Sequence, residues 1–365
     1  MGFKMGIVGL PNVGKSTLFN ALTRTAAAQA ANFPFCTIEP NVGEVAVPDT
    51  RLDTLAEIAK SKTIIPTRMT FVDIAGLVKG ASKGEGLGNQ FLANIREVDA
   101  IAHVLRCFED GDVTHVEGRV DPVADAETIE TELMLSDLES IERRLQNIVR
   151  KVRGGDKEAV QQERLLNEAR IVLENGQPAR TVEVSDDDAK AWGMLQLLTS
   201  KPVLFVCNVA EDEASEGNAL SARVAAMAAE QGAASVVISA KIEEEISQLE
   251  PDEAEMFLDE LGLSEAGLDR LIRAGYELLK LQTYFTVGPK EARAWTIPEG
   301  TKAPQAAGVI HGDFEKGFIR SETISFDDFV ALGGEQPSKD AGKMRAEGKT
   351  YLVKDGDVLH FLFSK

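Results

Sequence analysis

The sequence is poor in cysteine, in basic residues and in long apolar runs. Its three cysteines, Cys36, Cys107 and Cys207, lie far apart without metal-ligand spacing, so we expect free thiols in a reducing compartment. No apolar run is long enough to cross a bilayer, and the first residues lack the pattern of a secretory signal, which predicts a cytoplasmic protein without a membrane segment. The 59 acidic residues outnumber the 39 basic ones, and a net charge of −20 argues against a protein that coats nucleic acid through bulk electrostatics. This balance leaves room for local basic patches.

The sequence does contain a phosphate-binding pattern near its start. Residues 9–16 read GLPNVGKS, which fits GxxxxGK[ST], between a short apolar run and an amphipathic stretch. In a strand, glycine-rich turn and helix, this motif aims backbone N–H groups and a helix N-terminus at phosphate. We expect Lys15 to hold the β- and γ-phosphates and Ser16 to ligate Mg²⁺. The residues expected to surround the phosphates are Asn12, Val13, Gly14, Lys15, Ser16 and Thr17.

Two later segments have the pattern of the switch segments of Ras-like proteins. Thr37 is the only hydroxyl residue in a proline- and aromatic-rich loop, where a threonine can close onto Mg²⁺ and the γ-phosphate. An apolar run then ends in Asp73 and Gly76, a DxxG pattern. Asp73 would hold Mg²⁺ through water, and the Gly76 N–H would meet the γ-phosphate.

The residue after this glycine departs from the Ras-like pattern. Ras-like hydrolases place glutamine there to orient the attacking water, and this chain has Leu77. We therefore expect slow hydrolysis, or another group that orients the water. His115 is one candidate, because it lies in a polar, glycine-containing loop just past a buried strand, at the edge where parallel sheets bind ligands. An ordinary surface role is the alternative for His115.

A further pair of segments has the pattern of a base-binding site. GTPases carry NKxD after a buried strand, and this chain reads NVAE from Asn208 to Glu211. The longer glutamate should miss the guanine edge, whereas Asn208 and the backbone carbonyl of Val209 suit the 6-amino group of adenine. Ser239 begins the Ser-Ala-Lys pattern of the second base-binding loop. These residues predict ATP as the ligand, with GTP as the alternative.

Between the nucleotide-binding segments, the pattern changes to that of a helical hairpin over residues 125–198. Its first helix has a heptad seam, and Gly154-Gly155 separates it from a second amphipathic helix. The seam consists of Met134, Leu138, Ile141, Leu145, Ile148 and Val152. We expect basic residues at the tip, which either contact nucleic acid or form a solvated face. They are Arg143, Arg144, Arg150, Lys151, Arg153 and Lys157.

From residue 281 onward the pattern becomes that of β-strands. Alternating stretches are split by a Gly-Pro pair, and a closing strand follows near the end. These features predict a compact β-rich module over residues 281–365. Within it, Lys316 and Arg320 are candidate RNA contacts, with a plain exposed loop as the alternative.

Over its full length the chain resembles the YchF subfamily of Obg-like ATPases. The resemblance rests on GLPNVGKST at 9–17, NFPFCTIEPN at 32–41, DIAGLVKGASKGEGLG at 73–88 and NVAE at 208–211. It implies an α/β fold with a Ras-like P-loop NTPase sheet over residues 1–124 and 199–280, an inserted antiparallel coiled-coil hairpin and a C-terminal β-grasp (TGS) domain.

The resemblance also implies an enzyme that converts ATP and water to ADP and phosphate, has a hydrophobic residue in place of the catalytic glutamine, and associates with ribosomes. Asn12 is similar to an asparagine of potassium-stimulated relatives, whose carbonyl helps to hold K⁺ beside the phosphates, so K⁺ joins Mg²⁺ as a candidate cofactor. A non-catalytic nucleotide-binding scaffold, favoured by Leu77, and a GTP-specific switch are the alternatives.

Overall fold

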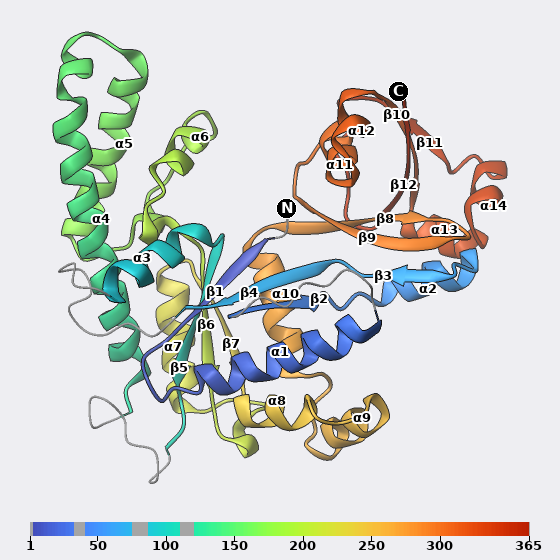
Figure 1. Ribbon diagram of the computed structural model, residues 1–365, viewed down its shortest axis with the longest axis horizontal. Coiled ribbons are helices and arrows are strands. Elements are labelled where there is room, and N and C mark those ends of the chain that lie inside the picture. The colour runs from blue at the N-terminus through green and yellow to red at the C-terminus, as the bar shows by residue number, and fades with distance from the viewer. Residues whose placement is uncertain (1–2, 33–40, 75–86, 110–119, 365) are drawn as a thin grey trace.

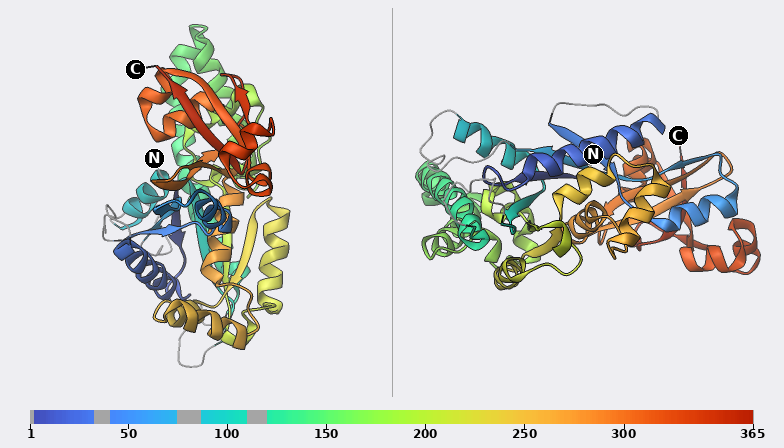
Figure 2. Two further views of the ribbon diagram at one scale, coloured as in Figure 1. Left: turned by 90° about the vertical axis from the view of Figure 1, so that its right-hand side faces the viewer. Right: turned by 90° about the horizontal axis from the view of Figure 1, so that it is seen from below.

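The computed structural model describes residues 3–32, 41–74, 87–109 and 120–364 of the chain. These residues form two six-stranded sheets, one in the N-terminal part of the chain and one built mainly from residues after 280. A long helical hairpin projects from the first sheet, and it and the second sheet lie at opposite ends of the molecule (Figures 1 and 2). None of the helices in the described ranges is both long and apolar enough to span a membrane.

The first sheet carries the predicted phosphate loop. Its strands follow the order β2-β4-β1-β5-β6-β7, and neighbours are parallel except for β2, which is antiparallel to β4. The strands are β1 (Lys4–Val8), β2 (Val42–Ala46), β4 (Arg68–Asp73), β5 (Ala100–Arg106), β6 (Val203–Asn208) and β7 (Ala234–Ile238). Every residue of β5 and β6 is buried, as expected for central strands of a sheet covered on both faces. The predicted Ras-like α/β sheet is thereby confirmed, and Cys107 and Cys207 are buried free thiols at the ends of β5 and β6.

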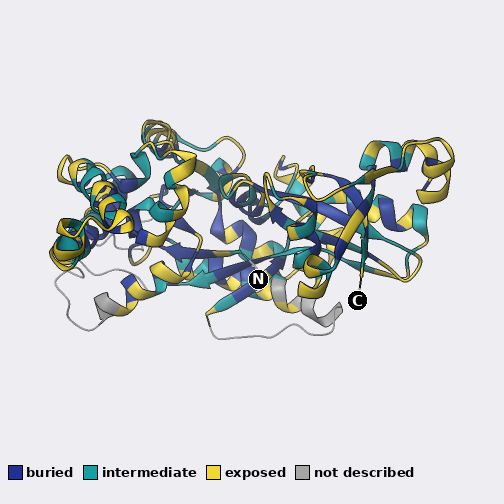
Figure 3. Cartoon of the chain, turned by 90° about the horizontal axis from the view of Figure 1, so that it is seen from above, coloured by how far each residue is buried: buried dark blue, intermediate teal, exposed yellow. Residues whose placement is uncertain are grey.

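Helices cover both faces of this sheet. They are α1 (Lys15–Asn32), α3 (Leu87–Glu97), α7 (Ala219–Glu230), α8 (Ala240–Ile246) and α10 (Gly267–Leu278), whereas α9 (Pro251–Glu260) packs beside α8 in a separate small cluster. Successive residues of β1 point to opposite faces, so that Met5 lies against Gly275 of α10 and Gly6 faces Val98 just beyond α3. A β-carbon at Gly275 would lie 2.6 Å from Met5 Cε, so α10 packs this closely only because glycine is there. Figure 3 shows that the buried residues follow the strands of both sheets.

The residues between β5 and β6 form the predicted hairpin. Its helices α4 (Pro122–Arg153) and α5 (Lys157–Glu174) are joined by a tight turn in which Gly155 has φ 78°. The heptad seam of α4 is confirmed from Met134 to Ile148, because Met134, Leu138, Ile141, Leu145 and Ile148 pack in one cluster with Leu165, Leu166, Ala169 and Leu173 of α5. Val152, the last predicted residue of the seam, is not part of this cluster. The chain then returns through η2 (Ala179–Thr181), α6 (Asp186–Leu195) and η3 (Leu198–Ser200).

The predicted group of six basic residues at the hairpin tip is only partly present. Arg144 donates a 2.6 Å hydrogen bond to the Leu195 carbonyl, and Arg143 forms a 3.0 Å ion pair with Glu139. Both lie about 10 Å or more from the turn, because a helix rises about 1.5 Å per residue. The basic residues exposed around the turn are Arg150, Lys151, Arg153 and Lys157.

The second sheet forms the core of the C-terminal domain. Its order is β11-β10-β12-β8-β9-β3, in which β12–β8 and β9–β3 are parallel and the other pairs antiparallel. Its strands are β3 (Thr63–Ile65), β8 (Leu281–Val287), β9 (Glu291–Pro298), β10 (Phe318–Ser325), β11 (Arg345–Glu347) and β12 (Asp357–Phe363). The helices after β9 are α11 (Ala303–Ile310), α12 (Gly312–Lys316), α13 (Phe326–Leu332) and α14 (Glu335–Asp340). This arrangement agrees with the predicted C-terminal β-grasp fold.

One part of the predicted domain division is wrong. The division assigns all of residues 1–124 to the nucleotide-binding domain, yet β3 is a strand of the C-terminal sheet and α2 (Thr50–Ala59) packs against that sheet (Figure 1). β3 pairs with β9, and Leu52 and Leu55 of α2 are buried in one cluster with Phe285 and Phe329. Burial of the apolar face of α2 is favourable, and the core of the C-terminal domain is where this face is buried.

Candidate nucleotide-binding site

The phosphate loop lies between the end of β1 and the first residue of α1. Asn12 and Gly14 have φ values of 65° and 93°, in the left-handed region that turns the chain sharply. A β-carbon at Gly14 would lie 2.1 Å from Asn208 Nδ2, so only glycine lets the loop rest on this side chain. The first turn of α1 contains no acidic residue, which leaves its N–H groups and its positive dipole end available to an anion.

Lys15 and Asp73 meet at this loop. The Lys15 ammonium forms an ion pair with Asp73 Oδ1, and both side chains are largely shielded, with 12% and 20% of their surfaces exposed. Asp73 ends β4 in register with Ile7, close to where β1 enters the loop. Mg²⁺ prefers oxygen ligands, and the Asp73 carboxylate and the Ser16 hydroxyl are of that kind. This donor set fits a magnesium ion next to a bound phosphate.

Asn208 joins the phosphate loop to the second base-binding loop. Its Nδ2 donates a 2.9 Å hydrogen bond to the Val13 carbonyl, and its Oδ1 accepts a 2.9 Å hydrogen bond from the Ala240 N–H. The side chain is 4% exposed, so both bonds are protected from water. Sequence reasoning expected Asn208 to accept from adenine, whereas the structure engages both ends of its amide within the protein.

A cavity of ≈ 560 Å³ lies beside the phosphate loop. Its lining residues are Asn12, Gly14, Thr17, Phe108, Glu109, Asn208, Val209, Ala210, Glu211, Ser239, Ala240, Lys241 and Glu244. Among the described residues, the buried Ser239 Oγ has no hydrogen-bond partner, so this hydroxyl can serve a ligand. Glu211 Oε2 lies 2.9 Å from Lys241 Nζ, and this ion pair engages the carboxylate at the place where GTPases have the base-reading aspartate. The cavity therefore places the apolar residues Phe108, Val209 and Ala210 beside hydroxyl, amide and charged side chains, a lining that can take the ring and the polar edge of a nucleotide base.

The structure brings most of the predicted site residues together. The phosphate loop, Asp73, Asn208, Val209 and Ser239 share one edge of the first sheet, at the carboxyl ends of its parallel strands. Three other predicted site residues, Thr37, Gly76 and His115, lie outside the described residues, and so does Leu77. Sequence reasoning missed Phe108 as part of the cavity, although its place directly after β5, at this same edge, was the available signal.

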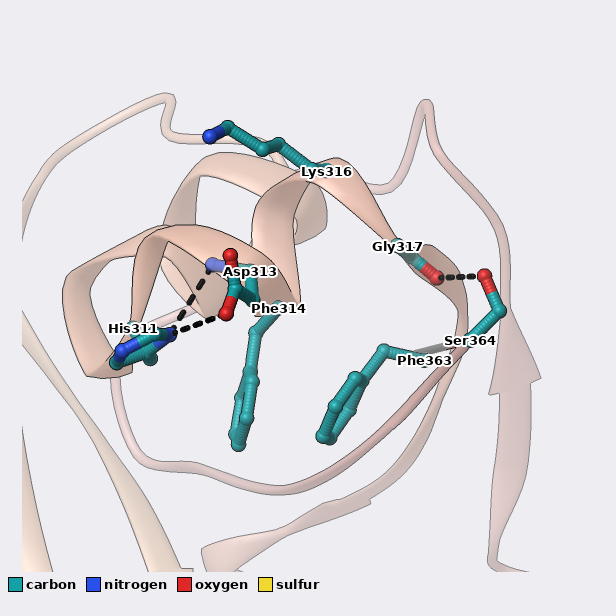
Figure 4. Close-up of a pocket in the computed structure, with 7 residues that line it drawn as sticks. All are labelled: His311, Asp313, Phe314, Lys316, Gly317, Phe363 and Ser364. Atoms are coloured by element: carbon teal, nitrogen blue, oxygen red, sulfur yellow. Dashed lines mark hydrogen bonds and ion pairs between the residues drawn. The ribbon is translucent and has the colours of Figure 1, made fainter.

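A second cavity, of ≈ 840 Å³, lies in the C-terminal domain (Figure 4). The rings of Phe314 and Phe363 stack there with centroids 3.9 Å apart, and Asp313 N–H donates to His311 Nδ1. Lys316 points away from the two rings in Figure 4. This cavity has no counterpart of the phosphate loop among its described lining residues, and the RNA contacts predicted for Lys316 and Arg320 stay predictions.

Comparisons with known proteins agree with this site. Residues 4–151 match the family MMR_HSR1, described as a 50S ribosome-binding GTPase, and residues 281–364 match YchF-GTPase_C, described as a protein of unknown function. The "Ribosome-binding ATPase YchF" of Escherichia coli O157:H7 is 58% identical over 364 residues, and its namesake in Bacillus subtilis (strain 168) is 54% identical over 366 residues, each covering 100% of both chains. A solved structure, "Structure of the Schizosaccharomyces pombe YchF GTPase", has a TM-score of 0.89 at 40% identity and covers 99% of this chain and 98% of that chain. Because these names include both ATPase and GTPase, the choice of base has to be argued from the site.

Proposed function

The chain belongs to the YchF family, and we propose that it is a cytoplasmic P-loop ATPase that binds ATP with Mg²⁺, hydrolyses it slowly and acts as a nucleotide-dependent switch on the ribosome. The observation that carries the proposal is the link made by Asn208, which fixes a complete phosphate loop against a base cavity without the GTPase aspartate. A phosphate site and a base site so joined can hold a whole nucleotide.

The phosphate end of the site is proposed to work through charge. Lys15 would exchange its ion pair with Asp73 for the β- and γ-phosphates, which carry more negative charge. Asp73 would then be free to hold Mg²⁺ through water, together with Ser16 and Thr37. When bound, Mg²⁺ supplies positive charge that stabilises the developing charge on the transferred phosphoryl group.

The base end of the site favours adenine. Guanine requires an acceptor for its N1–H and N2–H₂ groups, and the carboxylate nearest to that role, Glu211, is held by Lys241. Adenine requires an acceptor for its 6-amino group, which the Val209 carbonyl can provide. The Ser239 hydroxyl can donate to a ring nitrogen or accept from the amino group. One or two such bonds support a preference for ATP over GTP of roughly 10- to 100-fold.

The attacking water needs an orienting group other than Leu77. His115 is our first candidate, because an imidazole can accept a hydrogen bond from water and so orient it. K⁺ held at Asn12 is the second, because it adds positive charge beside the phosphates, and Asn12 lines the cavity in a left-handed conformation. A monovalent cation supplies charge but not orientation, which is why His115 ranks ahead.

The hairpin tip supports the ribosomal part of the proposal. Arg150, Lys151 and Arg153 are exposed at the end of α4, with Lys157 across the turn, at one extreme of a chain that is otherwise acidic (Figure 1). Such a local basic patch can bind RNA phosphates even though the net charge of the protein is negative.

Two measurements test the proposed function. Calorimetric titration with Mg²⁺-ATP and Mg²⁺-GTP should give tighter binding of ATP. Equal affinities would contradict the adenine preference, and tighter binding of GTP would favour the GTP-specific switch. Steady-state ATP turnover should be slow for the isolated protein and rise when ribosomes are added. If ATP binds but is not turned over in either condition, the protein is a nucleotide-binding scaffold.

A further inference from the structure

A buried guanidinium group contacts one of the residues that line the base cavity. Arg106, the last residue of β5, is only 1% exposed and is the largest of the fully buried side chains among the described residues. Removing a guanidinium from water is costly, so a side chain at this depth is held by the groups packed around it.

The contacts of Arg106 lead to Phe108. Arg106 Nε donates a 3.1 Å hydrogen bond to the Phe108 carbonyl, and its guanidinium carbon lies 4.7 Å from the centroid of the Phe108 ring. One side chain thus holds both the backbone and the ring of the same residue. The ring contact is of the cation–π kind, which gains strength where water is excluded.

Phe108 separates the guanidinium from the cavity. Phe108 is half-buried and lines the cavity, whereas Arg106 is not among the described lining residues. The guanidinium therefore supports the ring from the protein side and leaves the ring surface on the cavity side accessible. An aromatic surface of this kind is what a purine base stacks on.

The backbone around Arg106 is fixed independently of its side chain. Arg106 is in register with Asn208 of β6, the Cys107 N–H donates to the Asn208 carbonyl at 2.8 Å, and Asn218 Nδ2 donates to the Cys107 carbonyl at 2.7 Å. These bonds hold the chain as far as Cys107. Beyond that residue, the Arg106 side chain holds the Phe108 carbonyl and supports its ring.

We propose that Arg106 is a positioning residue for base recognition: it holds the Phe108 ring as the wall on which the adenine base stacks. The inference rests on the proposed function, since it requires that this cavity takes the base of ATP. It assigns the buried charge a task that concerns the base and not the phosphates.

The test compares a ligand that has a base with one that lacks it. Affinities for Mg²⁺-ATP and for Mg²⁺-tripolyphosphate are measured for the wild-type chain and for Arg106→Met, which keeps the length of the side chain and removes its charge and donors. We expect a loss of roughly 10-fold for ATP, the scale of a weakened base–aromatic stack, and a change of less than about 2-fold for tripolyphosphate. Arg106→Lys, which keeps the cation, should recover part of the ATP affinity. Arg143→Met, at a side chain that is 70% exposed, is the matched control and should change neither affinity.

A double substitution tests whether Arg106 acts through Phe108. Phe108→Ala should itself lower ATP affinity selectively, and adding Arg106→Met to it should cause little further loss, because the ring that Arg106 supports is already absent. If Arg106→Met fails to fold, the affinities for ATP and tripolyphosphate are measured instead for Arg106→Lys and for the double variant Arg106→Lys with Phe108→Ala.

Three results would overturn the inference. Equal losses for ATP and tripolyphosphate would give Arg106 a purely structural role, and unchanged ATP affinity would give it none in recognition. Additive losses in the double variant would show that Arg106 does not act through Phe108. A wild-type chain that binds ATP no better than tripolyphosphate would instead refute the proposed base site itself, before any variant is compared.

Discussion

Replacing Asn208 with alanine removes two hydrogen bonds that hold the nucleotide site together. The bonds end at the Val13 carbonyl of the phosphate loop and at the Ala240 N–H of the second base-binding loop, each at 2.9 Å. Alanine satisfies neither group, and both lie next to a side chain that is 4% exposed. The substitution therefore separates the two halves of the site without touching a residue that binds phosphate.

The expected magnitude follows from the two groups left without partners. A buried backbone group that loses its partner costs about 1–3 kcal/mol, so the pair would cost about 2–6 kcal/mol. Because the base cavity lies beside Asn208, water can reach part of the vacated space, and we expect the lower half of that range, about 2–4 kcal/mol. ATP and GTP affinities should both fall by at least about 10-fold, because the loops must first be brought back together.

Hydrogen exchange measured by mass spectrometry is the suitable assay. Peptides from the phosphate loop and from the base loops should show a lower opening free energy in Asn208→Ala, whereas peptides from the hairpin should not change. Asn167→Ala is the control, since Asn167 Nδ2 donates a 2.9 Å hydrogen bond to the Glu163 carbonyl within α5, where the pair is only partly buried, and its effect should stay within about 0.5 kcal/mol. This reasoning would be refuted if Asn208→Ala had the same hydrogen exchange in both loops, and the same ATP affinity, as the wild type.

Three further predictions concern single side chains. Lys15→Ala should abolish tight ATP binding in calorimetry, because it removes the side-chain cation of the phosphate loop; unchanged affinity would contradict the phosphate site. If K⁺ assists hydrolysis, replacing K⁺ with Na⁺ should slow ATP turnover in the wild type but not in Asn12→Ala. If His115 orients the water, His115→Ala should lower turnover while ATP affinity stays unchanged. If neither change affects turnover, a partner must orient the attacking water. Burial, together with the charge of Arg180, lowers the pKa of His103 from 6.5 to about 3. The unfolded chain therefore takes up a proton below pH 6.5 that the folded chain refuses, so stability is full above that pH and about 2 kcal/mol lower at pH 5. Urea unfolding of His103→Phe should lack this part of the pH dependence, and equal slopes in the two proteins would show that His103 is not the source.

The phosphate loop could be predicted because its chemistry is local in the sequence. The loop, the strand before it and the helix after it lie within about 30 residues, and the glycine and lysine positions follow directly from how backbone and ammonium groups bind phosphate. Asp73 and Asn208 could be predicted for a related reason. Each ends an apolar strand, and the carboxyl ends of parallel strands meet at one edge of the sheet.

The internal contacts of the site could not be predicted from the sequence. Asn208 has the right place for a base contact, but nothing in the chain indicates that Val13 and Ala240 occupy both ends of its amide. Arg106 stands within an apolar run, where a charged residue at the end of a strand is as compatible with solvent as with burial. Nothing in the sequence indicates that its guanidinium is buried and packs on the ring of Phe108.

The assignment of residues 50–65 failed because their partners are distant in the chain. Ser61 Oγ donates a 2.7 Å hydrogen bond to the Gly288 carbonyl, 227 residues away, and Arg51 forms a 2.6 Å ion pair with Asp355, 304 residues away. A short helix and a three-residue strand also carry too little pattern to specify which of two sheets they join. The choice is made by the apolar surface that each sheet leaves open.

Joining α2 and β3 to the second sheet places the start of β4 at the junction of the two domains. Thr67 lies just before β4, and its hydroxyl forms a hydrogen bond with the hydroxyl of Thr296 in β9. Six residues later, β4 ends at Asp73 in the nucleotide site. Because a strand rises about 3.3 Å per residue, these two contacts are about 20 Å apart along a single extended segment. β3 also pairs with β9, so that the outer edge of the hairpin formed by β8 and β9 is covered by a strand from the N-terminal part of the chain. The same twenty or so residues therefore complete the C-terminal sheet and lead into the strand that carries Asp73, which means that the nucleotide site and the C-terminal domain share one continuous segment of backbone.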